Sequence, residues 1–372
     1  MDYIIIFSGY NQRAVTAFLR TLSANQIENY LILASSPQDS IFKTQYASHV
    51  YAARTNHQLD LAEITAIIRR AQEEKGFRQF LVAPSTEALN RFLLRYEETF
   101  TRLGYRSSLP SQALYEQISD KSRFCALCAG RGIRIPQEIK FPERYERAFV
   151  AKPVSYSDAD GAVYSPVLIC SESDYQAFVR EYAQAAFYYQ RYVKGQSVYL
   201  LYYFPRRDQT GNHILTFSQE NLMQQPGGKS ILAARPGTFH LHPAAQQFKE
   251  LFLSVGYVGF VMVEVRLSLG QYYMIEANPR FWGPSQLFVD AGYNFFEEYL
   301  WDYGFLERQE RNRAFHPDAK YFWHGGTKPS SDGRQPAFYS GFEKTYLKDF
   351  LEYAQWDIYR REDTERLFFE YE

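Results

Sequence analysis

The segment 259–280 constrains the fold of this chain more than any other stretch. Two apolar runs flank Gly270, a pattern typical of two β-strands joined by a hairpin loop of three to five residues. A register centred on Gly270 puts Glu264 directly opposite Glu276, and Asn278 shares the face of Glu276 because side chains alternate along a strand. Like charges that face each other across a ladder repel, and the flanking residues are apolar. We therefore expect a positive group between the two glutamates.

The oxygen atoms of this segment predict a metal site. Two carboxylates and an amide oxygen form a hard, all-oxygen set of ligands, which suits magnesium bound to a nucleotide phosphate. Arg280 follows two positions after Asn278 and could bind phosphate or carboxylate oxygens. A hairpin with two solvent-facing glutamates has the same pattern, so residues upstream must decide between the two interpretations.

The composition is that of an ordinary soluble enzyme. A chain of 372 residues is too long for one compact core and suits two or three subdomains. The net charge of −1 gives no long-range field for nucleic acid or anionic membranes, and no apolar run has the length of a membrane span. The 31 Tyr and 30 Phe residues indicate mainly an aromatic-rich core. Three cysteines favour a reducing compartment, and residues 1–7 predict a strand, not a signal peptide. We expect a cytoplasmic protein.

Residues 1–112 alternate strand and helix signals. Strands are expected at 3–7, 30–34 and 80–83, and helices at 13–22 and 59–74. This alternation predicts a parallel sheet covered on both faces, with ligands beyond the carboxyl ends of its strands. Gly9 and Glu87 lie at such ends and could contact a substrate, although Ser85 could simply cap the next helix. No Gly-x-Gly-x-x-Gly motif follows the first strand, so a dinucleotide site there is not expected.

Two lysines in the next region are candidates for binding an anion. A helix is expected to begin at Ser119 and to end near residue 129, which puts Lys121 at its electropositive end. Lys152 ends a buried strand, where an ammonium group is costly unless it meets an anion. The loop 155–161 offers hydroxyl and backbone N–H groups that could close over phosphates. A solvated Lys121 fits the local pattern equally well.

The order of these motifs is more specific than any one of them. Along the chain it runs Asp120-Lys121, then Ala151-Lys152-Pro153, then the segment 189–195, then Glu264 and Glu276-Ala-Asn278-Pro-Arg280. This order resembles the ATP-grasp superfamily over roughly residues 1–310, and the segment 281–295 resembles its carboxylate–amine ligase branch. The resemblance implies a mixed α/β and α+β fold: an N-terminal parallel-sheet domain at 1–112, a small central lid at 113–195, a C-terminal antiparallel-sheet subdomain at 196–310, and a tail of uncertain fold at 311–372.

The resemblance also implies roles for individual residues. The expected magnesium ligands are Glu264, Glu276 and Asn278, and manganese is an alternative metal. Phosphate and nucleotide groups are expected at Lys121, Lys152, Gly161, Arg191, Tyr192, Val193 and Gln196. Arg280 and Lys152 are the expected catalytic residues, with Arg280 steadying the transferred phosphoryl group. Two departures concern the nucleotide contacts: the loop after Lys152 keeps only Gly161, and Arg191 and Gln196 or Ser197 replace acidic residues that are usual in the family.

The implied activity is ATP-dependent joining of a carboxylate to an amine, with release of ADP and phosphate. Phosphoryl transfer to a carboxylate needs neutralised charge and aligned reactants, not a protein nucleophile, and the resulting acyl phosphate is then attacked by the amine. An amino acid or small peptide is the expected substrate, and Arg235, His240 and Glu87 are candidates for contacting it. A homodimer agrees with the resemblance. The alternatives are a ligase that uses a thiol acceptor or carboxylates its substrate, and a nucleotide-binding protein without catalysis.

Three further patterns are set aside. The segment 226–230 lacks the first glycine that a P-loop needs, since that position is Met223. Cys125 and Cys128 fall inside a helix with only Cys170 left for a zinc site, so buried thiols are expected. His240 and His242 could share a strand face, but no further ligand of matching type is close in sequence.

Overall fold

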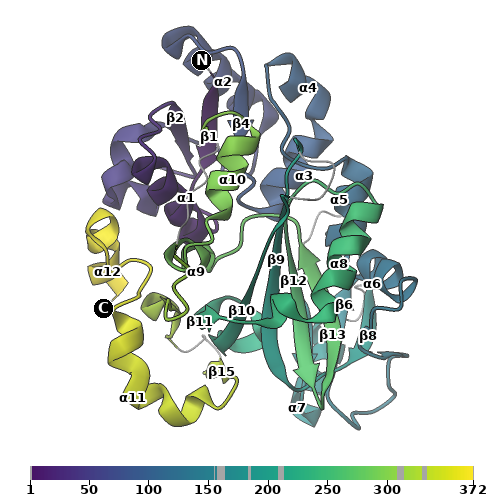
Figure 1. Cartoon of the computed structure of the whole chain (residues 1–372). Helices are drawn as coiled ribbons and strands as arrows, with labels where there is room; N and C mark the ends of the chain where they lie inside the picture. The colour runs from purple at the N-terminus through teal and green to yellow at the C-terminus, as the bar shows by residue number, and fades with distance from the viewer. Residues whose placement is uncertain are drawn as a thin grey trace.

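The structure is a computed structural model that describes residues 2–154, 156, 164–182, 186–207, 213–307, 314–328 and 333–371. Within these residues the chain forms a parallel sheet, a small antiparallel sheet and a large antiparallel sheet. Figure 1 shows the parallel sheet and its helices in the upper part of the molecule and both antiparallel sheets in the lower part, with β6 and β8 of the small sheet at the right. The predicted mixed α/β and α+β class is confirmed.

The N-terminal sheet is parallel, in the order β3-β2-β1-β4 (Val50–Ala53, Tyr30–Ala34, Tyr3–Phe7, Phe80–Val82). Alternate residues of β1 enter different cores, because strand side chains point to opposite faces. Ile4 and Ile6 pack with α1 (Gln12–Ala24), whereas Ile5 and Phe7 pack with α2 (Leu61–Lys75) and α3 (Glu87–Arg95). Helices therefore cover both faces, as predicted from the strand–helix alternation.

Two short helices lead from this sheet to the next region. They are α5 (Gln112–Ser119) and α6 (Lys121–Ala129), and α4 (Glu97–Arg102) lies upstream of both. The expectation that Ser119 begins a helix was wrong, because Ser119 is the last residue of α5 and Asp120 stands between the two helices. Lys121 is the first residue of α6, in the first turn as predicted.

The small sheet is antiparallel and runs β5-β8-β6-β7 (Glu138–Ile139, Phe187–Arg191, Phe149–Pro153, Val167–Ile169). Helix α7 (Glu172–Glu181) buries Tyr175 and Phe178 against Phe149 and Ile169. Lys152 lies near the end of β6, as expected from the proline that follows it.

The large sheet is antiparallel, in the order β13-β12-β9-β10-β11-β14, with β15 paired to β10. Its strands are Gln271–Asn278, Gly259–Ser268, Gln196–Phe204, Leu215–Gln224, Ile231–Pro236, Tyr321–Phe322 and Ala337–Phe338. Helix α8 (Pro243–Ser254) covers one face, and α9 (Ser285–Asp290) and α10 (Phe295–Asp302) pack on the other. That second face shares one core with α1, which joins the large sheet to the N-terminal domain.

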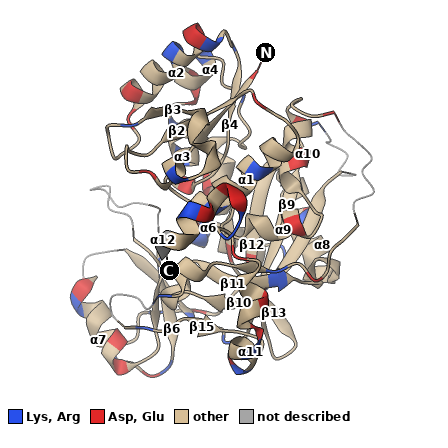
Figure 2. Ribbon diagram, turned by 90° about the vertical axis from the view of Figure 1, so that its left-hand side faces the viewer, with Lys and Arg blue, Asp and Glu red and all other residues tan. Residues whose placement is uncertain are grey.

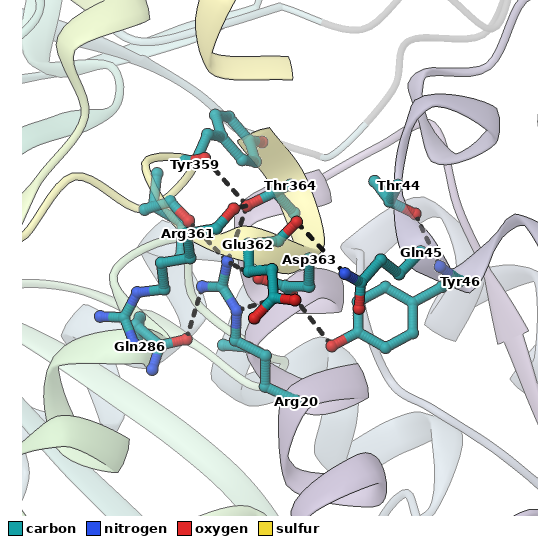
Figure 3. Close-up of polar contacts among 12 residues, drawn as sticks. Arg20, Thr44, Gln45, Tyr46, Gln286, Tyr359, Arg361, Glu362, Asp363 and Thr364 are labelled. Carbon is teal, nitrogen blue, oxygen red and sulfur yellow. Dashed lines mark hydrogen bonds and ion pairs between the residues drawn. The ribbon is translucent and has the colours of Figure 1, made fainter. Parts of the chain in front are cut away.

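The C-terminal region folds back onto the rest of the chain. It contains α11 (Phe342–Ala354) and α12 (Glu365–Tyr371), and Figure 1 shows both, in yellow, beside α1 and β11. The attachment centres on Arg20 of α1, whose guanidinium binds both oxygens of Asp363 at 2.8 and 2.9 Å (Figure 3). Tyr46 donates to the same carboxylate at 3.0 Å, and Gln286 accepts from Arg20 at 3.0 Å. The tail is therefore tied to the N-terminal domain by a partly buried charged network.

Charged residues of both signs are interspersed along helices such as α2, α6 and α7 (Figure 2). This distribution agrees with the net charge of −1. Among the described residues, no helix has both the length and the apolar character that crossing a bilayer requires.

Candidate functional site

The site is built on the hairpin of β12 and β13. Leu269 and Gly270 form a two-residue turn in which both φ angles are positive (50° and 73°), so the expectation of a three- to five-residue loop was wrong. A two-residue turn alone would pair Glu264 with Ile275. A β-bulge at Ile275 shifts the register by one residue, and Glu264 therefore lies opposite Glu276 as predicted.

Glu276 is held by cations and by its neighbour on the same face. Lys121 Nζ lies 3.1 Å from one carboxylate oxygen, and Asn278 Nδ2 donates to the other at 2.9 Å. Burial disfavours the charged form, but Lys121, the bond from Asn278 and the ammonium of Lys152 outweigh it and lower the pKa of Glu276 to about 2. Burial by itself would lower the pKa of Lys121, but the carboxylates of Glu276 and Glu87 outweigh it and raise this pKa. Glu276 and Lys121 are therefore both charged at neutral pH.

Glu264 is in a different electrostatic environment. Its side chain is buried and pairs with Arg266 at 3.0 Å. Burial raises the pKa of Glu264, Arg266 opposes the rise, and the facing Glu276 adds to it. Arg266 is itself buried and lies under the ring of Tyr339, 4.7 Å from its centroid. A carboxylate of the hairpin is thus linked through Arg266 to the C-terminal region.

Lys152 comes to the same place from the small sheet. Its side chain is 4% exposed, and Nζ donates to the carbonyl of Ile275, the bulge residue, at 2.8 Å. Burial lowers the pKa of Lys152, while Glu276 and Glu264 act in the opposite direction. The expected positive charge near the two glutamates is therefore provided by Lys121 of α6 at Glu276, by Arg266 of β12 at Glu264, and by the nearby Lys152 of β6.

Arg280 lies beyond the end of β13. Its Nη1 donates to the carbonyl of Phe281 at 3.1 Å, and its backbone N–H donates to Asn278 at 3.0 Å. Phe281 N in turn donates to the carbonyl of Pro84 at 2.9 Å, just past β4. The end of the hairpin is thereby fixed against the carboxyl end of the parallel sheet.

A cleft of about 1260 Å³ opens at this junction. Its walls come from the carboxyl ends of β1, β3 and β4, from α3, α5 and α6, and from the hairpin, and Glu276, Asn278 and Arg280 line it. Glu87 also lines it, paired with Arg91 at 2.9 Å, and Arg91 lies 2.7 Å from Asp120. Thr86, not Ser85, caps α3, since its side chain accepts from Leu89 N.

No family model and no curated protein matches the sequence, but solved structures match the fold. N5-carboxyaminoimidazole synthetase from Staphylococcus aureus, complexed with ADP, covers 95% of this chain and 98% of its own, with a TM-score of 0.62 and 14% identity. L-amino acid ligase from Bacillus licheniformis covers 86% and 78%, with a TM-score of 0.59 and 15% identity. A biotin carboxylase complex from Campylobacter jejuni covers 84% and 73%, with a TM-score of 0.59 and 12% identity.

The chain has the ATP-grasp fold. The two lysines come from α6 and β6 and meet the two glutamates and Asn278 at the β12–β13 hairpin. Of this group Glu276, Asn278 and Arg280 line the cleft, whereas Lys121, Lys152 and Glu264 lie behind them and are not in its lining.

The predicted hinge residues connect the small sheet to the large one. Arg191 ends β8, Tyr192 N donates to the carbonyl of Ala148 at 3.2 Å, and Gln196 begins β9. The side chain of Gln196 donates to Glu220. Tyr192 lies close enough to Arg266 and Tyr339 to affect their pKa values, so the hinge and the Glu264 side of the hairpin are neighbours. Val193 lies in the same connection, and Gly161 lies outside the described residues.

Two predicted substrate residues lie elsewhere. Arg235 pairs with Glu220 at 2.7 Å, and its side chain is 52% exposed. His240 lies in a 3-10 turn, where Nδ1 is 3.0 Å from Ser218 Oγ, and burial lowers its pKa. Neither is among the described residues that line the cleft.

Two residues of the site, Arg266 and Tyr339, were not predicted from the sequence. Arg266 could have been found, because it stands two positions after Glu264 on the same strand and therefore on the same face. The contribution of Tyr339 depends on a contact with a distant segment, and no local pattern indicates it.

Proposed function

We propose that this protein is an ATP-dependent ligase that joins a carboxylate to an amine through an acyl phosphate and releases ADP and phosphate. The observation that supports this most is the convergence of Lys121, Lys152 and Asn278 around Glu276, which together with Asn278 and Arg280 lines one end of a cleft. Cations and carboxylates brought together from separate elements suit phosphoryl transfer, which depends on positioning and electrostatic stabilisation.

The hairpin fits a divalent cation. Glu264 and Glu276 face each other in register, Asn278 adds an amide oxygen, and all three would hold Mg²⁺ or, as a substitute, Mn²⁺. Glu264 pairs with Arg266 and Glu276 pairs with Lys121, which indicates that the two carboxylates need positive charge beside them. A bound metal would supply charge neutralisation for the phosphate oxygens.

The remaining residues would bind the nucleotide and orient the reactants. We assign phosphate binding to Lys121 and Lys152, with Gly161 in the loop over the phosphates. The backbone of 191–193 would hold adenine, and Gln196 would lie near the ribose. Arg280 would steady the transferred phosphoryl group through its guanidinium.

The substrate would occupy the cleft, and Glu87 is the predicted substrate residue that lines it. A carboxylate at the end of the cleft could orient an amine through a charged hydrogen bond. An amino acid or small peptide as substrate is supported by the likeness in fold to an L-amino acid ligase, and the likeness to biotin carboxylases keeps carboxylation as a variant of the reaction. We assign no role to Arg235 and His240, since both lie away from the cleft lining. We further propose a cytoplasmic enzyme, with a homodimer as its expected assembly.

One observation favours a second candidate, an ATP-binding protein without turnover. Arg266 already neutralises Glu264 at 3.0 Å and could keep that carboxylate from a metal. Magnesium-dependent turnover separates the two candidates.

The experiment is to incubate the purified protein with Mg-ATP and with pooled carboxylates and amines, and to analyse nucleotides and products by mass spectrometry. Substrate-dependent ADP together with a condensed product would support the ligase. Release of AMP instead of ADP would indicate an acyl adenylate intermediate and contradict the acyl phosphate. Saturable ATP binding without turnover with any pool would favour the second candidate. Lys75→Ala, an exposed lysine at the end of α2, is a matched control for lysine variants.

A further inference from the structure

Arg54 is a buried guanidinium at the edge of the parallel sheet. It follows β3 directly, and its backbone N–H donates to the carbonyl of Ala34 at 2.9 Å, so it lies at the carboxyl end of the sheet, where ligands of such sheets bind. The residue is 2% exposed and is among the largest fully buried side chains of the described chain. Burial of a charged group is costly unless an anion compensates for it.

The described residues give this guanidinium almost no partner. Nη1 donates to the carbonyl of Gln58 at a long 3.4 Å, Nε is buried without a hydrogen bond, and no ion pair to Arg54 occurs among the residues that the structure describes. By contrast, Arg20 and Arg266 each have a carboxylate within 3.0 Å. Arg54 therefore has unused donors in a place where unused donors are unfavourable.

Two carboxylates lie near Arg54, but their oxygens are engaged elsewhere. Asp39 accepts from Ser8 Oγ at 2.7 Å and from Ser35 N at 2.7 Å. Glu63 is bound by the backbone of Thr55 and Asn56. These carboxylates affect Arg54 only through space, and burial has the larger effect and lowers its pKa. A guanidinium nevertheless stays protonated in proteins.

Arg54 lines the same cleft as the hairpin residues Glu276 and Asn278. Tyr10 and His57 stand beside it in the lining, with Tyr10 Oη 3.1 Å from His57 Nδ1. Strands β2 and β1 separate β3 from β4, and at about 4.8 Å per strand this spans roughly 14 Å. Arg280 is fixed near the β4 end of the cleft, and Arg54 therefore lies at the opposite end.

We propose that Arg54 binds the carboxylate of the amine substrate, which does not react, at the β3 end of the cleft. A carboxylate matches the two-pronged donor geometry of a guanidinium. A single negative charge is also favoured over a phosphate dianion, because Asp39 and Glu63 already place negative charge around Arg54. This inference rests on the proposed ligase function and extends it: the substrate that supplies the amine also carries a free carboxylate, as an amino acid or small peptide does.

A binding experiment tests the subsite without turnover. The arginine Nε–H resonances of the full-length protein are recorded by NMR, and the Arg54 peak is identified by its absence in Arg54→Lys. Pooled L-amino acids and dipeptides should shift this peak saturably, whereas the same pool with amidated carboxyl termini should not. An Arg54 peak that stays still in both pools, or that moves with inorganic phosphate alone, would overturn the proposal.

A kinetic experiment tests its consequence. Arg54→Gln should raise KM for the amine substrate roughly tenfold or more, the usual effect of losing a charge-assisted hydrogen bond, and leave KM for ATP within about twofold. Arg69→Gln, an exposed arginine of α2, is the matched control. Unchanged ATP binding by Arg54→Gln shows that the variant is folded.

The two proposals fail in different ways. Turnover with unchanged KM in Arg54→Gln would refute the subsite and leave the ligase intact. A shifted Arg54 resonance without ADP release from any pool would refute the ligase and support the subsite.

Discussion

The ammonium of Lys152 donates to the carbonyl of Ile275 at 2.8 Å, and Ile275 is the one residue that the β13 strand inserts as a bulge. The bulge has two effects. It puts Glu276 opposite Glu264, and it leaves a carbonyl available for a lysine from another sheet. Bulges commonly redirect side chains near active sites. The metal and phosphate groups of the proposed site are thus coupled through one backbone irregularity.

Lys152→Ala is expected to weaken ATP binding by at least about tenfold, because it removes a buried cation from the proposed phosphate site. Isothermal titration with Mg-ATP measures the effect, and Lys75→Ala should leave the affinity unchanged. If Lys152→Ala binds ATP as wild type does, while thermal unfolding shows it to be folded, the phosphate role is wrong.

Glu276→Gln is expected to lower magnesium-dependent turnover by roughly a hundredfold or more, since an amide oxygen carries no negative charge to balance the divalent cation. ADP release measured over a range of Mg²⁺ concentrations checks this. Glu73→Gln, an exposed glutamate of α2, controls for the loss of one charge. Equal turnover by the variant and the wild type would remove Glu276 from the metal site.

The same residue predicts a difference in acid stability. The pKa of Glu276 in the folded chain is about 2, below the unfolded value of about 4.3. A carboxyl group whose pKa is lowered by folding adds stability above its unfolded pKa, and this contribution disappears as the pH falls through the folded value. The free energy of unfolding of Glu276→Gln should therefore fall less steeply than that of wild type between about pH 4.3 and 2. Urea unfolding at several pH values measures it, and parallel curves would contradict the low pKa.

The register of the hairpin could be predicted, but only because two deviations cancel. The expected centre at Gly270 is wrong for a turn of Leu269 and Gly270, and the bulge at Ile275 restores the pairing. Nothing in the local sequence signals the bulge, because its carbonyl is stabilised by Lys152, more than a hundred residues away.

Whether other features could be predicted depends on whether the residues that determine them are close together in the sequence. The parallel sheet and Lys121 in the first turn of α6 follow from local patterns and were predicted. Helix α5 was missed because Ser119 has the form of a helix cap, although it ends that helix. The unused N–H donors of Arg54 could not be predicted, since the sequence does not show that the nearby carboxylates of Asp39 and Glu63 accept hydrogen bonds from other groups.

Arg266→Met tests whether the Glu264 pair competes with metal. Removing one partner of a buried ion pair leaves the other unpaired and typically costs about 3–5 kcal/mol. Without magnesium the variant should therefore unfold at a lower temperature than wild type. Added Mg²⁺ should stabilise the variant more than wild type, because Glu264 no longer has a competing cation. Equal stabilisation by Mg²⁺ in both proteins would mean that Glu264 is not a metal ligand.

The C-terminal region should be held in place mainly through Arg20. Arg20→Met leaves Asp363 partly buried without its bidentate partner, so the free energy of unfolding should fall by about 3 kcal/mol. Amide hydrogen exchange should accelerate around residues 358–369 more than in the large sheet. Arg69→Gln should change neither quantity. Because Tyr339 of this region lies over Arg266, loosening the tail should also weaken the Glu264 pair. If Arg20→Met accelerates amide exchange in residues 358–369 but is stabilised by Mg²⁺ as much as wild type, the attachment of α12 does not affect the Glu264 pair of the hairpin.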